Sequence, residues 1–171
     1  MGPIAHTGIG FLGFKLSDSK ENKRILLYLF LMANLPDIDF LFSLIFTKAK
    51  SIHQLYTHNI FFVGITTGLL LLIVKSLRSR WKIFLLVAYS HLLLDLFVVD
   101  PIPPLGIKLF FPIIDKPLNF GFFPNLWRNG FKEIFSLHNF FVFFLEYVIF
   151  ILPVWLLMKG KNSKKKRRKK S

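Results

Sequence analysis

Apolar stretches, separated by short polar or basic segments, constrain the fold of this chain more than any other feature. Of its 171 residues, 53% are hydrophobic, and apolar side chains dominate residues 3–15, 25–46, 60–74, 83–99 and 134–158. The longer stretches reach the ~20 residues that a helix needs to cross a bilayer. Backbone groups inside a bilayer must be satisfied within the protein, which favours helices. The sequence therefore predicts an all-α, multi-pass helical bundle, with one membrane-embedded domain over residues 1–158.

Pro36 interrupts the second apolar stretch. A proline lacks the backbone donor of a helix and disfavours helical geometry at the residue before it. We therefore expect a broken helix: a half-helix over 25–35, a turn that carries Asp37 and Asp39, and a short second piece over 40–46. Residues 100–133 are rich in proline and phenylalanine and are predicted to form a connection.

The positive charge is concentrated in two segments. The chain has 23 Lys and Arg against nine Asp and Glu, and the basic residues cluster in the 75–82 loop and in the tail over 159–171. Basic loops stay on the cytoplasmic side. We therefore expect a protein of the plasma (inner) membrane whose basic loops and disordered tail are cytoplasmic. The bilayer is its expected partner, with anionic lipid favoured over nucleic acid for the tail.

The acids and histidines gather in four short clusters. They are His6, the Asp37–Asp39 turn, the His53–His58 stretch and the His91–Asp95 pair. With the basic segments cytoplasmic, all four clusters fall at the outer ends of their helices. Ionisable groups at membrane depth are costly and mark functional sites by default. Imidazoles and carboxylates together form the ligand set of a divalent metal, so we expect one shared site.

Each cluster also has a structural explanation. His91 and Asp95, four residues apart, share a helical face and could simply hydrogen-bond across a helix pair. One aspartate of the turn could cap the next helix, although that leaves the other unexplained. The two histidines at 53 and 58 could be interfacial. His138 is expected to be an interface residue, and Glu146 to be protonated or paired with a polar group of the bundle.

The order of these motifs resembles the YdjM-like family. The matching residues are His6, then Leu35-Pro36-Asp37-Ile38-Asp39, His53-x-x-x-Thr57-His58 and His91-Leu92-Leu93-Leu94-Asp95, with Pro104 to Pro112 following. Members are inner-membrane proteins described as predicted metal-dependent hydrolases, also labelled LexA-binding, and distantly similar to zinc-dependent phospholipase C. The chain departs from the pattern at Gln54, where the family usually has Arg, and at Asn59, where it usually has Ser.

The resemblance implies a metal site of one or two divalent ions, with zinc favoured and Mn or Fe as alternatives. Its implied ligands are His6, Asp37, Asp39, His53, His58, His91 and Asp95. Of these, we expect Asp37, Asp39, His58 and Asp95 to take part in catalysis.

The leading functional hypothesis is a membrane-bound, metal-dependent hydrolase of phosphoesters, with lipid-like substrates included, that uses metal-activated water. A second hypothesis is a non-catalytic membrane protein with a structural metal site, whose basic tail binds anionic lipid or nucleic acid. A third is a transporter that uses the acids for ion coupling. The small size and the lack of an internal repeat count against the third. The chain has no cysteine, which excludes thiolate metal sites and cysteine nucleophiles.

Overall fold

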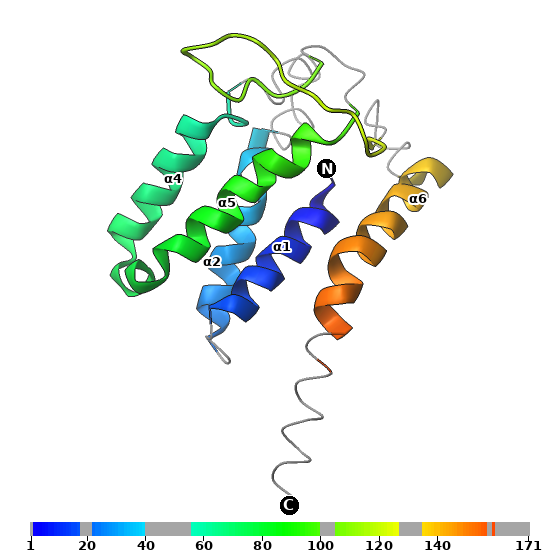
Figure 1. Cartoon of the computed structure of the whole chain (residues 1–171). Coiled ribbons are helices and arrows are strands. Elements are labelled where there is room, and N and C mark those ends of the chain that lie inside the picture. The colour runs from blue at the N-terminus through cyan, green and yellow to red at the C-terminus, as the bar shows by residue number, and fades with distance from the viewer. Residues whose placement is uncertain are drawn as a thin grey trace, which may run out of the picture.

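The computed structural model describes residues 2–17, 22–39, 56–99, 105–126, 135–156 and 159, and their regular structure is helical (Figure 1). The α-helices are α1 (Pro3–Leu16), α2 (Lys23–Asn34), α4 (Ile60–Ile73), α5 (Trp81–Leu96) and α6 (Leu137–Glu146). Shorter segments are the 3₁₀ helices η1 (Leu35–Asp37) and η3 (Lys75–Arg80) and the π-helical segment η5 (Tyr147–Ile151), which continues α6. These ranges contain two isolated β-bridges and no named strand. The predicted all-α class is confirmed.

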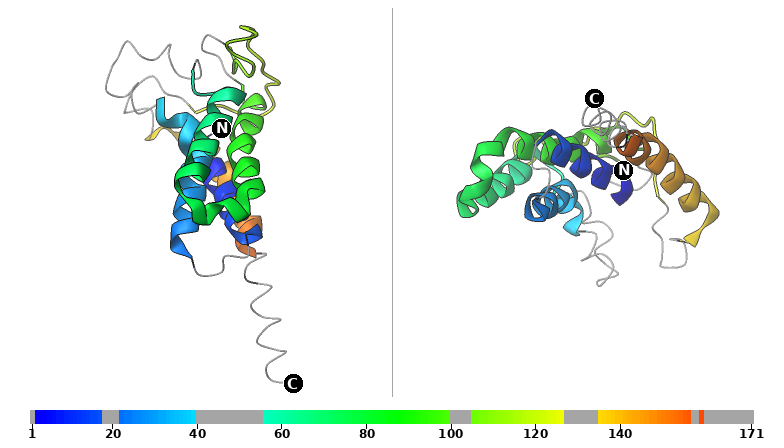
Figure 2. Two further views of the ribbon diagram at one scale, coloured as in Figure 1. Left: turned by 90° about the vertical axis from the view of Figure 1, so that its left-hand side faces the viewer. Right: turned by 90° about the horizontal axis from the view of Figure 1, so that it is seen from below.

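Helix α1 lies at the centre of the arrangement. It packs against α2, α5 and the continuous α6–η5 helix, and α5 also packs against α2 and α4. Seen from below, α4, α5, α1 and α6 follow one another in a curved row, with α2 to one side (Figure 2). Three buried glycines, Gly8, Gly10 and Gly13, give α1 a small surface, which lets neighbouring helices approach closely.

The break after α2 falls where the proline predicts it. Helix α2 ends at Asn34, and the 3₁₀ turn η1 carries the chain through Pro36 to Asp37. The C-terminal end of α2 lies at the same end of the bundle as the start of α4 (Figure 1), and Asp37 Oδ1 lies 3.3 Å from Nε2 of His58, just before α4. The predicted second piece over 40–46 and most of the basic tail lie outside the described residues.

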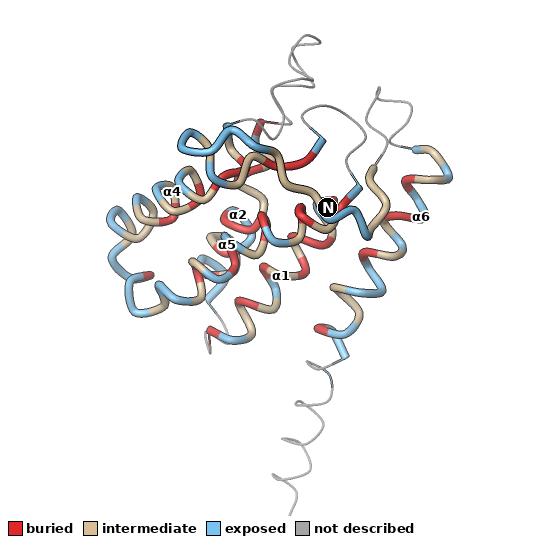
Figure 3. Tube along the Cα trace, turned by 45° about the horizontal axis from the view of Figure 1, so that its top comes forward, coloured by how far each residue is buried: buried red, intermediate tan, exposed pale blue. Residues whose placement is uncertain are grey.

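Burial separates an inner from an outer surface on the helices. Leu29, Phe84 and Val87 belong to a core shared by α2, α4 and α5, and each is at most 1% exposed. Outward-facing positions along α4 are apolar too: Leu72 is 64% exposed and Ile73 is 79% exposed (Figure 3). An apolar outer surface of this kind suits contact with lipid or a partner protein.

The lengths of the described helices support one membrane crossing. Among the described residues, one helix, Leu137–Leu156, is long and apolar enough to span a bilayer. The predicted ranges 60–74 and 83–99 correspond to α4, which has 14 residues, and α5, which has 16, or about 21 and 24 Å at ~1.5 Å per residue. That is less than the ~30 Å thickness of the hydrocarbon core of a bilayer. The lengths of these helices therefore do not confirm the predicted multi-pass topology.

Candidate metal centre

Four side chains from three segments converge at one end of the bundle. Asp37 lies in η1 after α2, His58 lies just before α4, and His91 and Asp95 lie on one face of α5. His58, His91 and Asp95 are buried, whereas the side chain of Asp37 remains 25% exposed. Each offers one ligand atom, and the four atoms lie within 4.8 Å of one another. Four of the seven residues predicted as ligands therefore lie close together.

The contacts inside the cluster involve the same four atoms throughout. His58 Nε2 lies 3.3 Å from His91 Nε2, 3.3 Å from Asp37 Oδ1 and 3.3 Å from Asp95 Oδ2. His91 Nε2 lies 3.2 Å from Asp95 Oδ2 and 3.7 Å from Asp37 Oδ1. Five of the six edges of a small tetrahedron are therefore 3.2–3.7 Å long.

This geometry fits a divalent metal ion. Ligand atoms bound to zinc at ~2.0–2.1 Å in a tetrahedral site lie about 3.3–3.4 Å apart. Two imidazole nitrogens and two carboxylate oxygens suit zinc, and also suit manganese or iron. Four electron-rich atoms this close repel one another unless a cation lies among them. The donor set therefore fits the predicted cofactor, although it does not select one metal.

A backbone carbonyl orients His91. Its Nδ1 lies 2.7 Å from the carbonyl oxygen of Ala33 on α2. A carbonyl only accepts, so Nδ1 must carry the proton in this contact. In the neutral ring, Nε2 then presents its lone pair to the other three ligand atoms, as it does in histidines that bind metals.

A hydroxyl orients His58. Thr57 Oγ1 donates to Asp39 Oδ2 at 2.7 Å and lies 3.0 Å from His58 Nδ1. Because the hydroxyl gives its single hydrogen to Asp39, it must accept from His58 Nδ1. The chain from His58 through Thr57 to Asp39 therefore places the Nδ1 proton away from the cluster and turns Nε2 toward it.

Asp37 and His58, the two members of the cluster that lie outside the α-helices, have shifted pKa values. Burial favours the neutral form of His58, but hydrogen bonds to Asp37 and Asp95 outweigh it and raise the pKa of His58 to about 9. Burial likewise opposes the charge on Asp37, but His91 and the hydrogen bond from His58 hold the pKa of Asp37 well below its usual range. The cluster therefore attracts positive charge, either as a proton on His58 or as a metal ion in its place.

A family model described as YdjM inner membrane protein matches residues 1–163. The chain belongs to the YdjM family. The match includes all four ligand residues and extends beyond the motifs through α6. No curated protein and no solved structure matches the chain. The family description places YdjM proteins in the inner membrane, and it names no reaction.

His6 lies beside the four-residue cluster of this YdjM protein. Its Nε2 is 3.4 Å from Asp95 Oδ1 and 4.0 Å from Asp37 Oδ2, so it approaches the second oxygen of each carboxylate. Its ring stacks on His91 with 3.7 Å between centroids. The first helix therefore contributes a fifth side chain, which approaches the two carboxylate oxygens that His58 does not.

The remaining predicted ligands occupy different positions. Asp39 Oδ2 is 3.7 Å from Nδ1 of His58, the ring nitrogen that faces away from the cluster, and Asp39 is not among the four grouped ligands. His53 and Gln54 lie outside the described residues. His138 Nε2 contacts the carbonyl oxygen of Asn125 at 2.8 Å, and it too is not among the four.

Sequence reasoning did not assign a role to Thr57, to the Ala33 carbonyl or to Asn59. Thr57 belongs to the family motif, but a threonine alone does not indicate a contact with His58. The Ala33 carbonyl is a backbone group, so the sequence cannot indicate its contact with His91. Asn59 is the N-cap of α4: its Oδ1 accepts from Phe62 N at 2.8 Å. Serine is an equally good N-cap, so this departure from the family pattern preserves the start of α4 next to His58.

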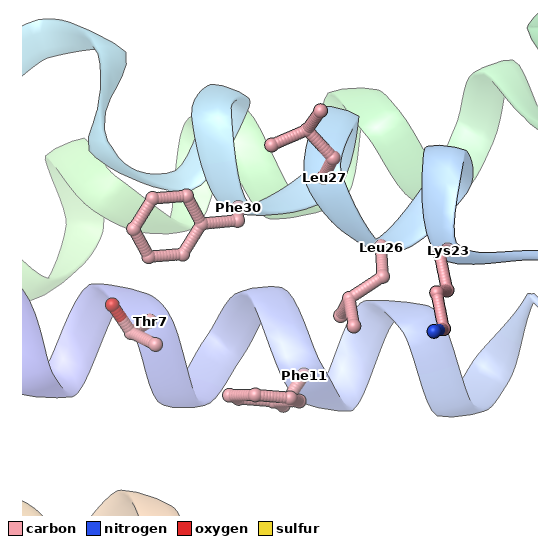
Figure 4. Close-up of a pocket in the computed structure, with 6 residues that line it drawn as sticks. All are labelled: Thr7, Phe11, Lys23, Leu26, Leu27 and Phe30. Carbon is pink, nitrogen blue, oxygen red and sulfur yellow. The ribbon is translucent and has the colours of Figure 1, made fainter.

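A groove of about 260 Å³ lies between α1 and α2 (Figure 4). Its lining is mostly apolar, with Phe11, Leu26, Leu27 and Phe30 between Thr7 and Lys23. None of the four ligand residues lines it. The groove offers space for an apolar chain but no chemistry of its own.

Proposed function

We propose that this protein is a membrane-embedded, metal-dependent hydrolase that cleaves phosphoesters, with lipid-like molecules as the favoured substrates. The observation that carries the proposal is the tetrahedral set of four ligand atoms contributed by Asp37, His58, His91 and Asp95. A divalent ion held there would supply Lewis-acid activation of water and of a phosphoryl oxygen. The distant similarity to zinc-dependent phospholipase C that is expected of the YdjM-like family favours the phosphoester class.

The ligand types favour a catalytic over a purely structural centre. Structural zinc sites are typically closed and rich in cysteine, whereas this set has two carboxylates and the chain has no cysteine. The side chain of Asp37 is 25% exposed and forms the open edge of the cluster. A substrate would approach past Asp37, and the buried His58 and His91 would hold the opposite side.

His6 extends the proposal toward two ions. In both Asp37 and Asp95, one carboxylate oxygen lies near His58 and the other lies near His6. Carboxylates in this arrangement can bridge two metals, which lie ~3.5–4 Å apart in hydrolytic two-metal sites. Alternatively, His6 would hold or move a proton next to the substrate. Counting the bound ions separates these two roles.

The segment over 105–126 supports a lipid-like substrate. It lies at the same end of the bundle as the cluster (Figure 1). Several of its large apolar side chains face outward, including Ile113 and Phe122, each 74% exposed. Apolar side chains beside a buried polar centre suit a surface that enters the lipid interface. We propose that a lipid headgroup reaches Asp37 from this side.

The proposed topology follows from charge and surface. The exposed apolar side chains along α4 and α5 support insertion of the whole bundle, with the short helices covered by lipid and by each other. Basic residues at η3 lie at the opposite end from the cluster, which favours a cytoplasmic η3. We propose the same side for the tail, as a basic segment separate from the domain over 1–158, where it would contact anionic lipid.

The decisive test combines metal content with turnover. The protein would be purified in detergent without chelators, bound metals measured by mass spectrometry, and hydrolysis assayed with a chromogenic phosphodiester and a short-chain phospholipid. Variants Asp37→Asn and His91→Ala should lose both metal and turnover. Asp115→Asn is the matched control for metal binding, because this exposed carboxylate pairs with Lys108 and is not among the four grouped residues.

Two results would contradict the proposal. A native protein that holds no metal would remove the centre itself. A native protein that holds one ion per chain, keeps it through the assay and cleaves none of the phosphoesters would instead favour a structural metal site.

A further inference from the structure

We infer that Glu146 is a positioning residue: from the membrane helix α6 it holds the first turn of α1, and with it His6, against the metal centre. The inference rests on the proposed centre. Glu146 lies within the one described helix that is long enough to span a bilayer, yet it is only 4% exposed. A buried acid in such a helix needs a partner inside the protein.

That partner is the backbone at the start of α1. The Glu146 carboxylate accepts hydrogen bonds from the N–H groups of Gly2 and Ala5, the latter at 3.3 Å. Helix α1 has no side-chain cap from its own N-cap residue, Gly2, and Pro3 has no N–H to donate. A carboxylate is well placed there, because the N-terminus of a helix carries unsatisfied donors and partial positive charge.

Gly2 makes this contact possible. A Cβ added at Gly2 would lie 2.8 Å from Glu146 Oε2, 2.9 Å from Oε1 and 2.9 Å from Leu126 Cδ1. Real Cβ atoms essentially never approach other atoms so closely. Any larger residue would therefore push the carboxylate away from the first turn. The close approach needs both an acid at 146 and a glycine at position 2.

His6 follows Ala5 directly, so the same turn sets its position. Its Nε2 must stay near Asp95 Oδ1, 3.4 Å away, while its ring stays stacked on His91. Further along α1, Gly8 lies against Phe150, where an added Cβ would be 2.9 Å from the Phe150 Cβ. This second contact keeps α1 paired with η5 when the carboxylate is removed. Loss of Glu146 should therefore release the first turn and leave the helix pair assembled.

The test measures cobalt binding in the full-length protein in detergent. Co²⁺ reports both affinity, by competition with a chelator, and ligand geometry, by its visible absorption. Glu146→Ala should change the spectrum and weaken Co²⁺ binding about 10- to 100-fold, because His6 contacts the Asp95 carboxylate and losing a group that orients a ligand usually costs that much. Glu146→Gln keeps one acceptor oxygen and should fall between native and alanine. Gly2→Ala keeps the acid but displaces its carboxylate, and it should also fall between native and Glu146→Ala.

Two controls make the result specific. Val142→Ala removes buried packing one turn earlier on α6 and should bind Co²⁺ like the native protein. In a His6→Ala background, Glu146→Ala should add no further loss, because Glu146 acts through His6.

Native-like binding by Glu146→Ala, or a full additional loss in the His6→Ala background, would overturn this inference and leave the centre intact. A native protein that binds no Co²⁺ would overturn the proposed centre, and the inference with it.

Discussion

Replacing Thr57 by valine removes the hydroxyl that joins His58 to Asp39 and changes the size of the side chain little. The hydroxyl lies 3.0 Å from His58 Nδ1 and 2.7 Å from Asp39 Oδ2, so both contacts are lost together. Removing the group that orients a metal-binding histidine costs about 10- to 100-fold in affinity, or about 1.4–2.8 kcal/mol. We expect Thr57→Val to weaken metal binding by that amount while the helical content stays native.

The assay is chelator competition on the purified protein, with Thr57→Ser as the matched control because serine keeps the hydroxyl. Asp39→Asn adds a second comparison. An amide oxygen can still accept from Thr57, so this variant should lose less affinity than Asp37→Asn, in which a ligand atom itself is changed. Native affinity in Thr57→Val would refute the orienting chain. Equal losses in Asp39→Asn and Asp37→Asn would show that Asp39 is a direct ligand.

Two further predictions concern protons and the helix start. His58 has a pKa of about 9, and its proton must leave when a metal ion binds. Titration calorimetry at several pH values should therefore show the affinity for metal rising about tenfold per pH unit below pH 9 and levelling off above it. In the metal-free protein the raised pKa of His58 stabilises the fold below about pH 6.5, and thermal melts should show that contribution fading as the pH rises through 9. Asn59→Ala should destabilise the start of α4 by about 0.5–2 kcal/mol, and Asn59→Ser should restore it, measured by denaturant unfolding in detergent.

The sequence was sufficient to predict the ligands that follow from local rules. His91 and Asp95 share a face because a helix repeats every ~3.6 residues, and Pro36 ends α2 just before Asp37. Placing the basic segments on the cytoplasmic side fixed the direction of each helix. These directions predicted that clusters far apart in the sequence would meet at one end of the bundle. Each of these inferences needs only a few neighbouring residues and the direction of the helices.

Other features depended on tertiary contacts that no local pattern encodes. Thr57 differs from any other threonine only because Asp39 lies across from it. Glu146 was visible as an acid in an apolar helix, but its partner is a pair of backbone N–H groups, which have no signature in sequence. The ends of α4 and α5 also differ by a few residues from the predicted ranges, because helix ends depend on caps such as Asn59 and on turns such as η3.

The contact between Glu146 and Gly2 joins positions 144 residues apart, nearly the full length of the chain. Because synthesis runs from the N-terminus, the first turn of α1 is made before the four clustered residues, and Glu146 is made after all of them. On the inferred role of Glu146, α6 would be the closing step in assembly. A product that stops before α6 would contain all four clustered residues yet lack the carboxylate that caps the turn before His6, so the centre itself would distinguish a chain without α6 from one that has it.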